Sequence, residues 1–141
     1  MKNTERLLKL LQGDAKLNAA QIATMLGEPV GEVEKEIEKL EKDGIIMGYR
    51  TIINWEKTDA RIASALIEVR VTPQRDTGFD EIAKRIMEFP EVESVYLMSG
   101  GYDLSVKVNA PTMSEVAMFV SKRLAPIGGI LSTATHFVLT H

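Results

Sequence analysis

The chain has 141 residues, 45% of them hydrophobic, and a formal net charge of −3. It contains no cysteine, which excludes disulfide bonds, thiolate nucleophiles and cysteine-ligated metal sites. The acidic charge argues against a protein that coats nucleic acid by bulk electrostatics, because neutralising phosphates requires clustered lysine and arginine. No apolar run approaches the roughly 20 residues that span a bilayer, and no signal peptide pattern begins the chain, so we expect a soluble cytoplasmic protein with no membrane partner.

Apolar residues recur with helical spacing in the first third of the chain and predict three short helices. The first is expected over residues 4–13, with Thr4 as its N-cap and a glycine at its end. The second is expected over residues 18–27, where Asn18 is the capping residue. The third is expected over residues 29–44, between a proline at its start and a glycine at its end. We therefore expect three helices joined by tight connections.

The apolar pattern changes from helical to β-rich near residue 45. Residues 45–55, IIMGYRTIINW, predict either a short two-stranded ribbon or an extended connector that leaves the helices. Residues 55–60 have the composition of a linker. We therefore expect a helical domain with a short ribbon over residues 1–54, and a second domain over residues 61–141.

The second domain begins with a clear strand pattern. Residues 63–71, ASALIEVRV, alternate apolar and polar side chains, and Pro73 ends the strand. Further on, the segments VESVYLM and YDLSVKV are separated by Ser99, Gly100 and Gly101, which is typical of a β-hairpin. The elements expected in chain order are a strand at 63–71, a helix at 78–88, strands at 92–98 and 102–108, a helix at 112–124 and a strand at 129–139.

This βαββαβ order predicts an α+β fold. Four antiparallel strands form one sheet, and both helices pack on the same face of it, as in a ferredoxin-like sandwich. The opposite face of the sheet then has no cover from the same chain. We therefore expect that face to dimerise or to bind another molecule.

Three segments resemble the leucine-responsive regulatory protein and asparagine-operon regulator (Lrp/AsnC) family of transcription factors. They are LLKLLQGDAKLNAAQIATMLG, IEKLEKDGIIMGYRTIIN and MSGGYDLSVKV. The resemblance covers nearly the whole chain. It implies an N-terminal winged helix-turn-helix that binds double-stranded promoter or operator DNA, and an ACT-like C-terminal domain. It also implies homodimers that assemble into tetramers or octamers, with a small-molecule effector, an amino acid, bound between C-terminal domains.

The third helix is the expected reading element of a helix-turn-helix, yet residues 27–44 hold seven acidic residues and three lysines. At 100° per residue, Lys35, Lys39 and Lys42 lie opposite the apolar stripe of this helix, and most of the acidic residues lie on its flanks. One interpretation is a DNA-contacting lysine stripe. The other is an ordinary solvated helix with ion pairs such as Glu38–Lys42, each worth about 0.2 to 0.5 kcal/mol. The residues expected to contact DNA are Asn18, Gln21, Gly31, Lys35, Glu38, Lys39, Lys42 and Arg50.

The glycine turn of the hairpin is the candidate effector site. Glycine permits positive φ and a close approach of a ligand to the backbone, although turn chemistry alone also explains this segment. The resemblance implies that backbone groups of this loop bind the effector, with Asp103 as a partner for an ammonium group. The residues expected to bind the effector are Ser99, Gly100, Gly101, Tyr102, Asp103, Thr133 and Thr135.

Two alternatives to a DNA-binding regulator come from the same residues. The acidic third helix also fits an effector-binding or assembly protein whose DNA affinity is weak or lost. A branch that resembles this family decarboxylates haem precursors, so an enzyme is the second alternative. Against it, the chain has no phosphate loop, nucleophile elbow or metalloprotease motif, and His136 and His141 would point to opposite faces of a strand. We therefore expect no enzyme activity, no metal site and no cofactor.

Overall fold

The computed structural model describes residues 2–72 and 79–140. The chain divides into two compact units, residues 1–53 and residues 54–141. Each unit has its own cluster of buried apolar side chains. None of the helices in the described ranges combines the length and the apolar character that a bilayer crossing requires.

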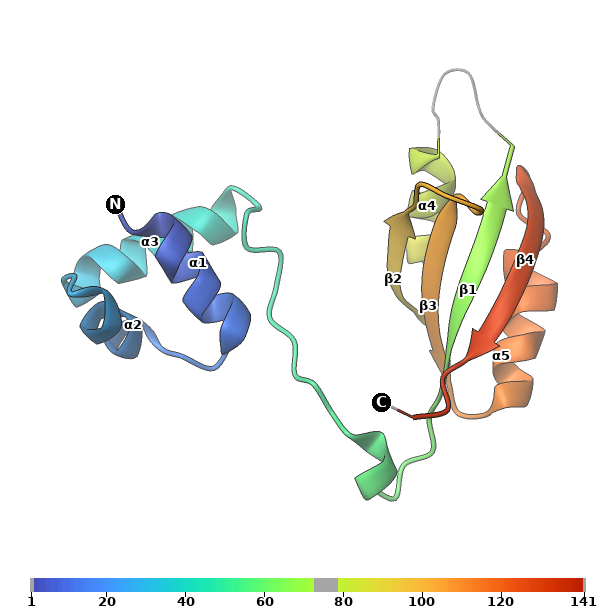
Figure 1. Ribbon diagram of the computed structural model, residues 1–141, viewed down its shortest axis with the longest axis horizontal. Coiled ribbons are helices and arrows are strands. Elements are labelled where there is room, and N and C mark those ends of the chain that lie inside the picture. The colour runs from blue at the N-terminus through green and yellow to red at the C-terminus, as the bar shows by residue number, and fades with distance from the viewer. Residues whose placement is uncertain (1, 73–78, 141) are drawn as a thin grey trace. The chain divides into compact units, whose positions relative to one another are not determined.

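The N-terminal unit is built from three helices, which match the predicted ranges within two residues (Figure 1). They are α1 (Thr4–Gly13), α2 (Ala19–Leu26) and α3 (Val30–Lys42). Each helix turns one apolar stripe inward, because residues three and four apart lie on the same face. The buried core consists of Leu7, Leu11, Ile22, Ala23, Leu26, Val33 and Leu40.

The helix ends follow the sequence signals with one exception. Asn18 and Gln21 form a reciprocal capping box at the start of α2, and Gly27 ends that helix with a φ of 67°. The predicted capping role of Thr4 is wrong. The residue at the N-cap of α1 is Asn3, which makes no side-chain capping bond, while the Thr4 hydroxyl donates a 2.7 Å hydrogen bond to Glu36 of α3. The Thr4 hydroxyl, which the local pattern predicted to cap α1, thus binds a residue of another helix instead.

Residues 45–54 form an extended connector and contain no strand. This is the second of the two predicted alternatives for this segment, rather than the ribbon. Its apolar side chains are unusually open to solvent, since Met47 is 94% exposed and Ile52 is fully exposed. The short 3-10 turn η1 (Trp55–Lys57) follows, and the Asn54 side chain caps it by accepting from the Glu56 amide.

The C-terminal unit is a four-stranded antiparallel sheet with strand order β2-β3-β1-β4. Figure 1 shows α4 and α5 on the same side of this sheet, so the predicted α+β sandwich is confirmed. In chain order its elements are β1 (Ala63–Val71), α4 (Asp80–Met87), β2 (Val92–Leu97), β3 (Leu104–Ala110), α5 (Met113–Phe119), the π-helix η2 (Val120–Leu124) and β4 (Ile130–Phe137).

The sheet core follows the predicted alternation, because Ala65, Ile67 and Val69 of β1 are all fully buried. Differences occur at element ends. The helix expected at 78–88 is observed from Asp80, and its expected start, as well as Pro73, lies outside the described residues. The last turns of the helix expected at 112–124 have the wider π geometry, which the apolar pattern did not indicate.

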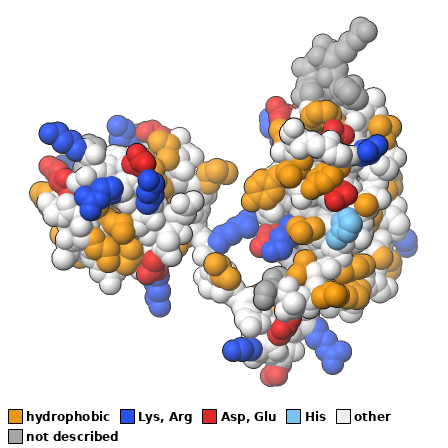
Figure 2. Space-filling view, in the orientation of Figure 1, with side chains coloured by type: hydrophobic (Ala, Val, Ile, Leu, Met, Phe, Trp, Pro, Cys, Tyr) orange, Lys and Arg blue, Asp and Glu red, His pale blue; other side chains and the backbone are white. Residues whose placement is uncertain are grey.

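Among residues 54–72 and 79–140, no element covers the second face of the sheet. The strand register places both polar and apolar side chains on this open face. Figure 2 views the sheet from the open face and shows the two kinds of side chain intermixed. Leu66 and Tyr96 are exposed large apolar side chains on this face. The residues of β1, β2, β3 and β4 that face this way include Leu66, Glu68, Arg70, Tyr96, Ser105, Lys107 and His136.

Candidate nucleic-acid interface and effector loop

The three lysines of α3 form an exposed stripe opposite the buried side chains Val33 and Leu40. Lys35, Lys39 and Lys42 make no ion pair with any described residue. The pair Glu38–Lys42 that the helix pattern allowed is therefore not formed, and Glu32 does not pair with Lys35 either. An unpaired ammonium group is available to an external anion without the cost of breaking an existing ion pair.

Two acidic residues near this stripe are held by side chains from the start of α1. The carboxylate of Glu36 accepts a hydrogen bond of 2.7 Å from the Thr4 hydroxyl, and the carboxylate of Glu28 accepts one of 3.1 Å from the side-chain amide of Asn3. Both contacts are partly buried. They border a cleft of about 520 Å³ that Lys35 and Lys39 also line. Two of the acidic groups that made α3 look unsuited to DNA therefore have partners within the protein.

The candidate backbone-contacting residues lie at the start of α2 and α3. The Asn18 side chain accepts from the Gln21 amide at 2.8 Å, and the Gln21 side chain accepts from the Asn18 amide at 2.9 Å. Both residues are therefore engaged in capping, while they remain exposed. Gly31, in the first turn of α3, has no atom within 4 Å of the position that a Cβ would occupy. The start of α3 thus leaves room for another molecule close to its backbone.

Arg50 lies on the extended connector, in a cleft of about 590 Å³ that side chains of α1 also line. Tyr49 lines the same cleft. Burial, and to a lesser degree the carboxylate of Glu41, raises the pKa of Tyr49 above its ordinary value. The phenol therefore stays protonated at neutral pH and can donate a hydrogen bond.

The hairpin loop between β2 and β3 is anchored to β1 by three hydrogen bonds. The Arg70 Nε donates to the Gly101 carbonyl at 2.9 Å. The Val71 amide donates to a carboxylate oxygen of Asp103 at 2.9 Å, and the Asp103 amide donates to the Val69 carbonyl at 2.9 Å. Asp103, the expected partner for a ligand ammonium group, thus has one oxygen committed to the backbone.

Arg70 is a residue of this loop environment that the sequence reasoning missed. The alternation over residues 63–71 places Arg70 on the outward face of the first strand but does not indicate its neighbours. Its position one residue from the end of β1, whose partner strand starts beside the loop, was the available signal. Gly100 has a φ of 152°, so the turn does use the backbone freedom for which its glycines were singled out.

Thr133 and Thr135 share one face of β4, as expected, but the structure does not bring them to the loop. They pair with Val69 and Ile67, whose side chains are buried beneath the helices. Within one chain, β1 lies between β4, which carries these threonines, and β3, which begins at the loop. The distance between β4 and β3 is therefore two strand spacings, or about 10 Å. The loop and the threonines are therefore separate surfaces of a single subunit.

Replacing Asp103 by alanine tests the anchoring role of its carboxylate. The change leaves the partly buried Val71 amide without an acceptor, so we expect the free energy of unfolding to fall by about 1 to 3 kcal/mol. Asp103→Asn is the matched control, because its side-chain oxygen can still accept this bond. Equal losses for the two variants in urea unfolding would show that the hydrogen bond is not what matters.

No group of three or more potential metal ligands occurs in the ranges 2–72 and 79–140. His136 lies on the open sheet face with its Nε2 at 3.5 Å from a carboxylate oxygen of Glu68. His141 lies outside the described residues.

Comparison with known proteins identifies both halves of the chain. A winged helix-turn-helix DNA-binding model matches residues 2–47, and the Lrp/AsnC ligand binding domain model matches residues 64–141. An uncharacterized HTH-type transcriptional regulator of Bacillus subtilis, YugG, is 48% identical over 99% of this chain and 86% of its own length. The leucine-responsive regulatory protein of Haemophilus influenzae is 26% identical over 95% of this chain and 80% of its own length.

Solved structures share the fold. AsnC of Escherichia coli matches with a TM-score of 0.69 and 22% identity, covering 100% of this chain and 93% of that one. A transcriptional regulator of Neisseria meningitidis, solved as a complex with L-methionine, matches with a TM-score of 0.74 and 21% identity, covering 100% and 90%. The predicted resemblance is confirmed by the family models and by the B. subtilis relative. The chain belongs to the Lrp/AsnC family and is a DNA-binding transcriptional regulator, not an enzyme.

Proposed function

We propose that the protein reads double-stranded operator DNA with α3, and that Lys35, Lys39 and Lys42 supply its phosphate contacts. The observation that carries this assignment is the lysine stripe, which is exposed and unpaired among the described residues, while Glu36 and Glu28 are held by residues of α1 and the segment before it. The first turns of a reading helix lie deepest in the major groove, so Gly31 and Lys35 are the residues nearest base edges. Arg50 adds a phosphate contact from the connector.

The remaining acidic residues of α3 give this helix selectivity rather than raw affinity. Glu38 lies beside the lysine stripe, where its carboxylate can accept a hydrogen bond from the amino group of cytosine. The same carboxylate repels the acceptor groups that other base edges present. Lysine pairs best with the acceptor edge of guanine. The overall charge of −3 keeps binding to random DNA weak. We therefore expect a high ratio of specific to non-specific affinity.

The active species is a homodimer, which assembles further into tetramers or octamers. Two surfaces support self-association: the connector, with its exposed side chains Met47 and Ile52, and the open face of the sheet. Exposed apolar groups of this size mark interaction surfaces. A dimer also explains how a short helix selects a site, because two half-sites about one helical turn apart double the contacts.

The effector is an amino acid bound at the hairpin loop of residues 99–103. The amides of Gly100, Gly101 and Tyr102 donate no hydrogen bond to a described residue, so they can receive a carboxylate, as backbone nests do. The second oxygen of Asp103 is left for an ammonium group. The N. meningitidis regulator of the same fold was solved with L-methionine. Thr133 and Thr135 can join such a site only from another subunit.

A fluorescence titration of the promoter region of its own gene tests the DNA assignment. Three lysines and Arg50 in each of two subunits predict a log–log slope of affinity against salt of about −7. Absence of binding at low salt would refute this assignment and favour the effector-binding or assembly alternative. A thermal-shift screen of the twenty amino acids tests the effector, because a ligand at 100 times its dissociation constant stabilises by about 2.7 kcal/mol.

Substitution of Asn18 separates its capping role from DNA contact. Asn18→Ala removes the cap of α2, and we expect a loss of about 1 kcal/mol in the free energy of unfolding. Asn18→Asp retains a good cap but adds a negative charge at the phosphate-facing helix end. We expect stability to be kept and DNA affinity to fall several-fold, because the added carboxylate repels the phosphate backbone. Unchanged DNA affinity in the aspartate variant would leave Asn18 with a capping role alone.

A further inference from the structure

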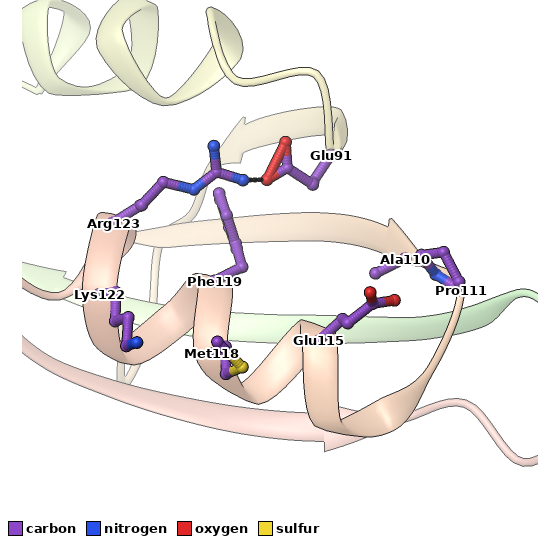
Figure 3. Close-up of a pocket in the computed structure, with 8 residues that line it drawn as sticks. All are labelled: Glu91, Ala110, Pro111, Glu115, Met118, Phe119, Lys122 and Arg123. Atoms are coloured by element: carbon purple, nitrogen blue, oxygen red, sulfur yellow. Dashed lines mark ion pairs between the residues drawn. The ribbon is translucent and has the colours of Figure 1, made fainter.

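A cavity of about 370 Å³ opens on the helix side of the C-terminal unit, between the end of β3 and the helical segment α5–η2 (Figure 3). It lies on the opposite side of the sheet from the open face. Its floor is apolar and is formed by Ala110, Pro111, Met118 and Phe119. Small-molecule sites in proteins are concave, of 300 to 1,000 Å³, and mostly apolar with a few charged groups. The size and lining of this cavity fit that description.

One wall of the cavity is a preorganised charged pair. Arg123 forms an ion pair with Glu91, and its guanidinium also lies over two aromatic rings, 5.1 Å from the centroid of Phe119 and 5.5 Å from that of Phe89. These rings pack edge to face with centroids 5.3 Å apart. The arginine is thus fixed by both charge and stacking, so this wall keeps its shape without a ligand.

The π-helix η2 is an independent sign of a functional surface here. The Ala125 amide donates to the Val120 carbonyl at 2.8 Å, which is the five-residue spacing of a π turn. Such turns are rare and occur frequently at functional sites. Arg123 lies on this π turn and lines the cavity.

Two further charges on the rim have no partner within the described chain. Glu115 and Lys122 are both exposed and make no ion pair with a described residue. They lie seven residues apart on the helical segment, about 10.5 Å along an ideal axis. Figure 3 shows Glu115 on one side of Met118 and Lys122 on the other. A carboxylate and an ammonium group thus border one apolar floor.

We propose that this cavity binds a zwitterionic α-amino acid with an apolar side chain, as a site separate from the hairpin loop. The ligand carboxylate pairs with Lys122, its ammonium group pairs with Glu115, and its side chain lies on Met118 and Phe119. The carboxylate of a simple organic acid is repelled by the carboxylate of Glu115. The ammonium group of a simple amine is repelled by Lys122 and Arg123. Only a ligand with both charges satisfies both rim residues.

The full-length protein carrying ¹³C-methyl-methionine gives a site-resolved test with L-leucine as the probe. Met118 reports on the cavity and Met98 on the hairpin loop, and a Met→Leu variant of each assigns its signal. We expect a saturable shift of the Met118 methyl signal at concentrations up to roughly 10 mM, which detects millimolar dissociation constants. A shift of Met98 alone, or no shift of Met118, would overturn the proposal.

Charge variants test the zwitterion assignment. Glu115→Gln and Lys122→Gln are each expected to weaken leucine binding at least tenfold, whereas Lys84→Gln, an equal change on exposed α4, leaves it unchanged. Lys122→Arg keeps the positive charge and retains binding. N-acetyl-leucine and leucinamide, which lack one charge each, are expected to bind at least tenfold more weakly. Equal binding of these analogues, or indifference to both glutamine variants, would also overturn the assignment.

The experiments distinguish a failure of the cavity site from a failure of the hairpin-loop site or of DNA binding by α3. Tyr102→Ala is expected to alter only the Met98 response. DNA titration of Glu115→Gln without amino acids is expected to match the unmodified protein, because Glu115 belongs to the C-terminal unit, whereas the lysine stripe belongs to the N-terminal unit. A cavity response that disappears with Tyr102→Ala would show that the signal arises at the loop, and would overturn the separate site.

Discussion

The double variant Lys35→Glu/Lys39→Glu is expected to lose operator affinity by roughly 4,000-fold at 0.1 M salt. Each phosphate contact contributes about 0.9 to the slope of log affinity against log salt, which is about eightfold per contact at that concentration. A dimer loses four such contacts, so the slope itself becomes shallower by about 3 to 4. The lysines are exposed and unpaired among the described residues, and the free energy of unfolding is expected to change little. Fluorescence titration at several salt concentrations measures both quantities.

Lys84→Glu is the control for reversing the charge of a lysine outside the N-terminal unit. Lys84 is exposed on α4 of the C-terminal unit, and its replacement makes half of the charge change of the double variant without touching the proposed interface. We expect a small loss of affinity with an unchanged salt slope, because a charge that contacts no phosphate acts only through the screened overall field. If the double variant retains its slope, the stripe makes no phosphate contact and α3 does not enter the groove as proposed.

Leu7→Ala is expected to destabilise the N-terminal unit by a large part of its stability while the sheet stays intact. Leu7 is fully buried in the three-helix core, and removing such a leucine costs about 2 to 5 kcal/mol. A unit of 53 residues has a total stability of about 3 to 8 kcal/mol at ordinary values per residue. DNA binding should therefore weaken although every candidate DNA-contacting residue is present. Amide hydrogen exchange measures the destabilisation, with protection reduced in α1–α3 and kept in β1 and β3.

Met25→Ala is the control within the same unit. Met25 is a large apolar residue of α2, but half of its surface is exposed, so little buried area is lost on truncation. We expect normal protection and normal DNA affinity. Loss of protection in β1 along with the helices in Leu7→Ala would contradict the separation of the two units, because it would show that they unfold cooperatively.

The fold could be predicted from the sequence because periodicity records burial directly. The alternation at residues 63–71 placed Ile67 and Val69 in the core before their partners were known, and both are fully buried. The helical stripe of α3 likewise placed Val33 and Leu40 inside. The capping box of Asn18 was readable because both of its hydrogen bonds join residues three positions apart.

The sites were less predictable because they depend on contacts between residues distant in sequence. The Thr4–Glu36 bond joins residues 32 apart, and the Arg70–Gly101 bond joins residues 31 apart. Neither leaves a local pattern. The helical periodicity of α3 predicted the face on which Lys39 lies. It did not predict that the Thr4 hydroxyl would donate a hydrogen bond to the carboxylate of Glu36. Similarly, the glycines predicted a turn at residue 100 but not that Asp103 would accept the Val71 amide.

The sequence by itself determined the two-part architecture, the βαββαβ order and the lysine stripe of α3, because each follows from spacings shorter than three helical turns. Only the tertiary structure decided which charges remain available. It committed Glu36, Glu28 and one oxygen of Asp103 to internal partners. It also placed Arg123 over Phe119 through a π turn that no apolar period encodes. The physical reason is that a charge's partner depends on how elements pack, whereas the face on which it lies depends only on the repeat of its own helix or strand.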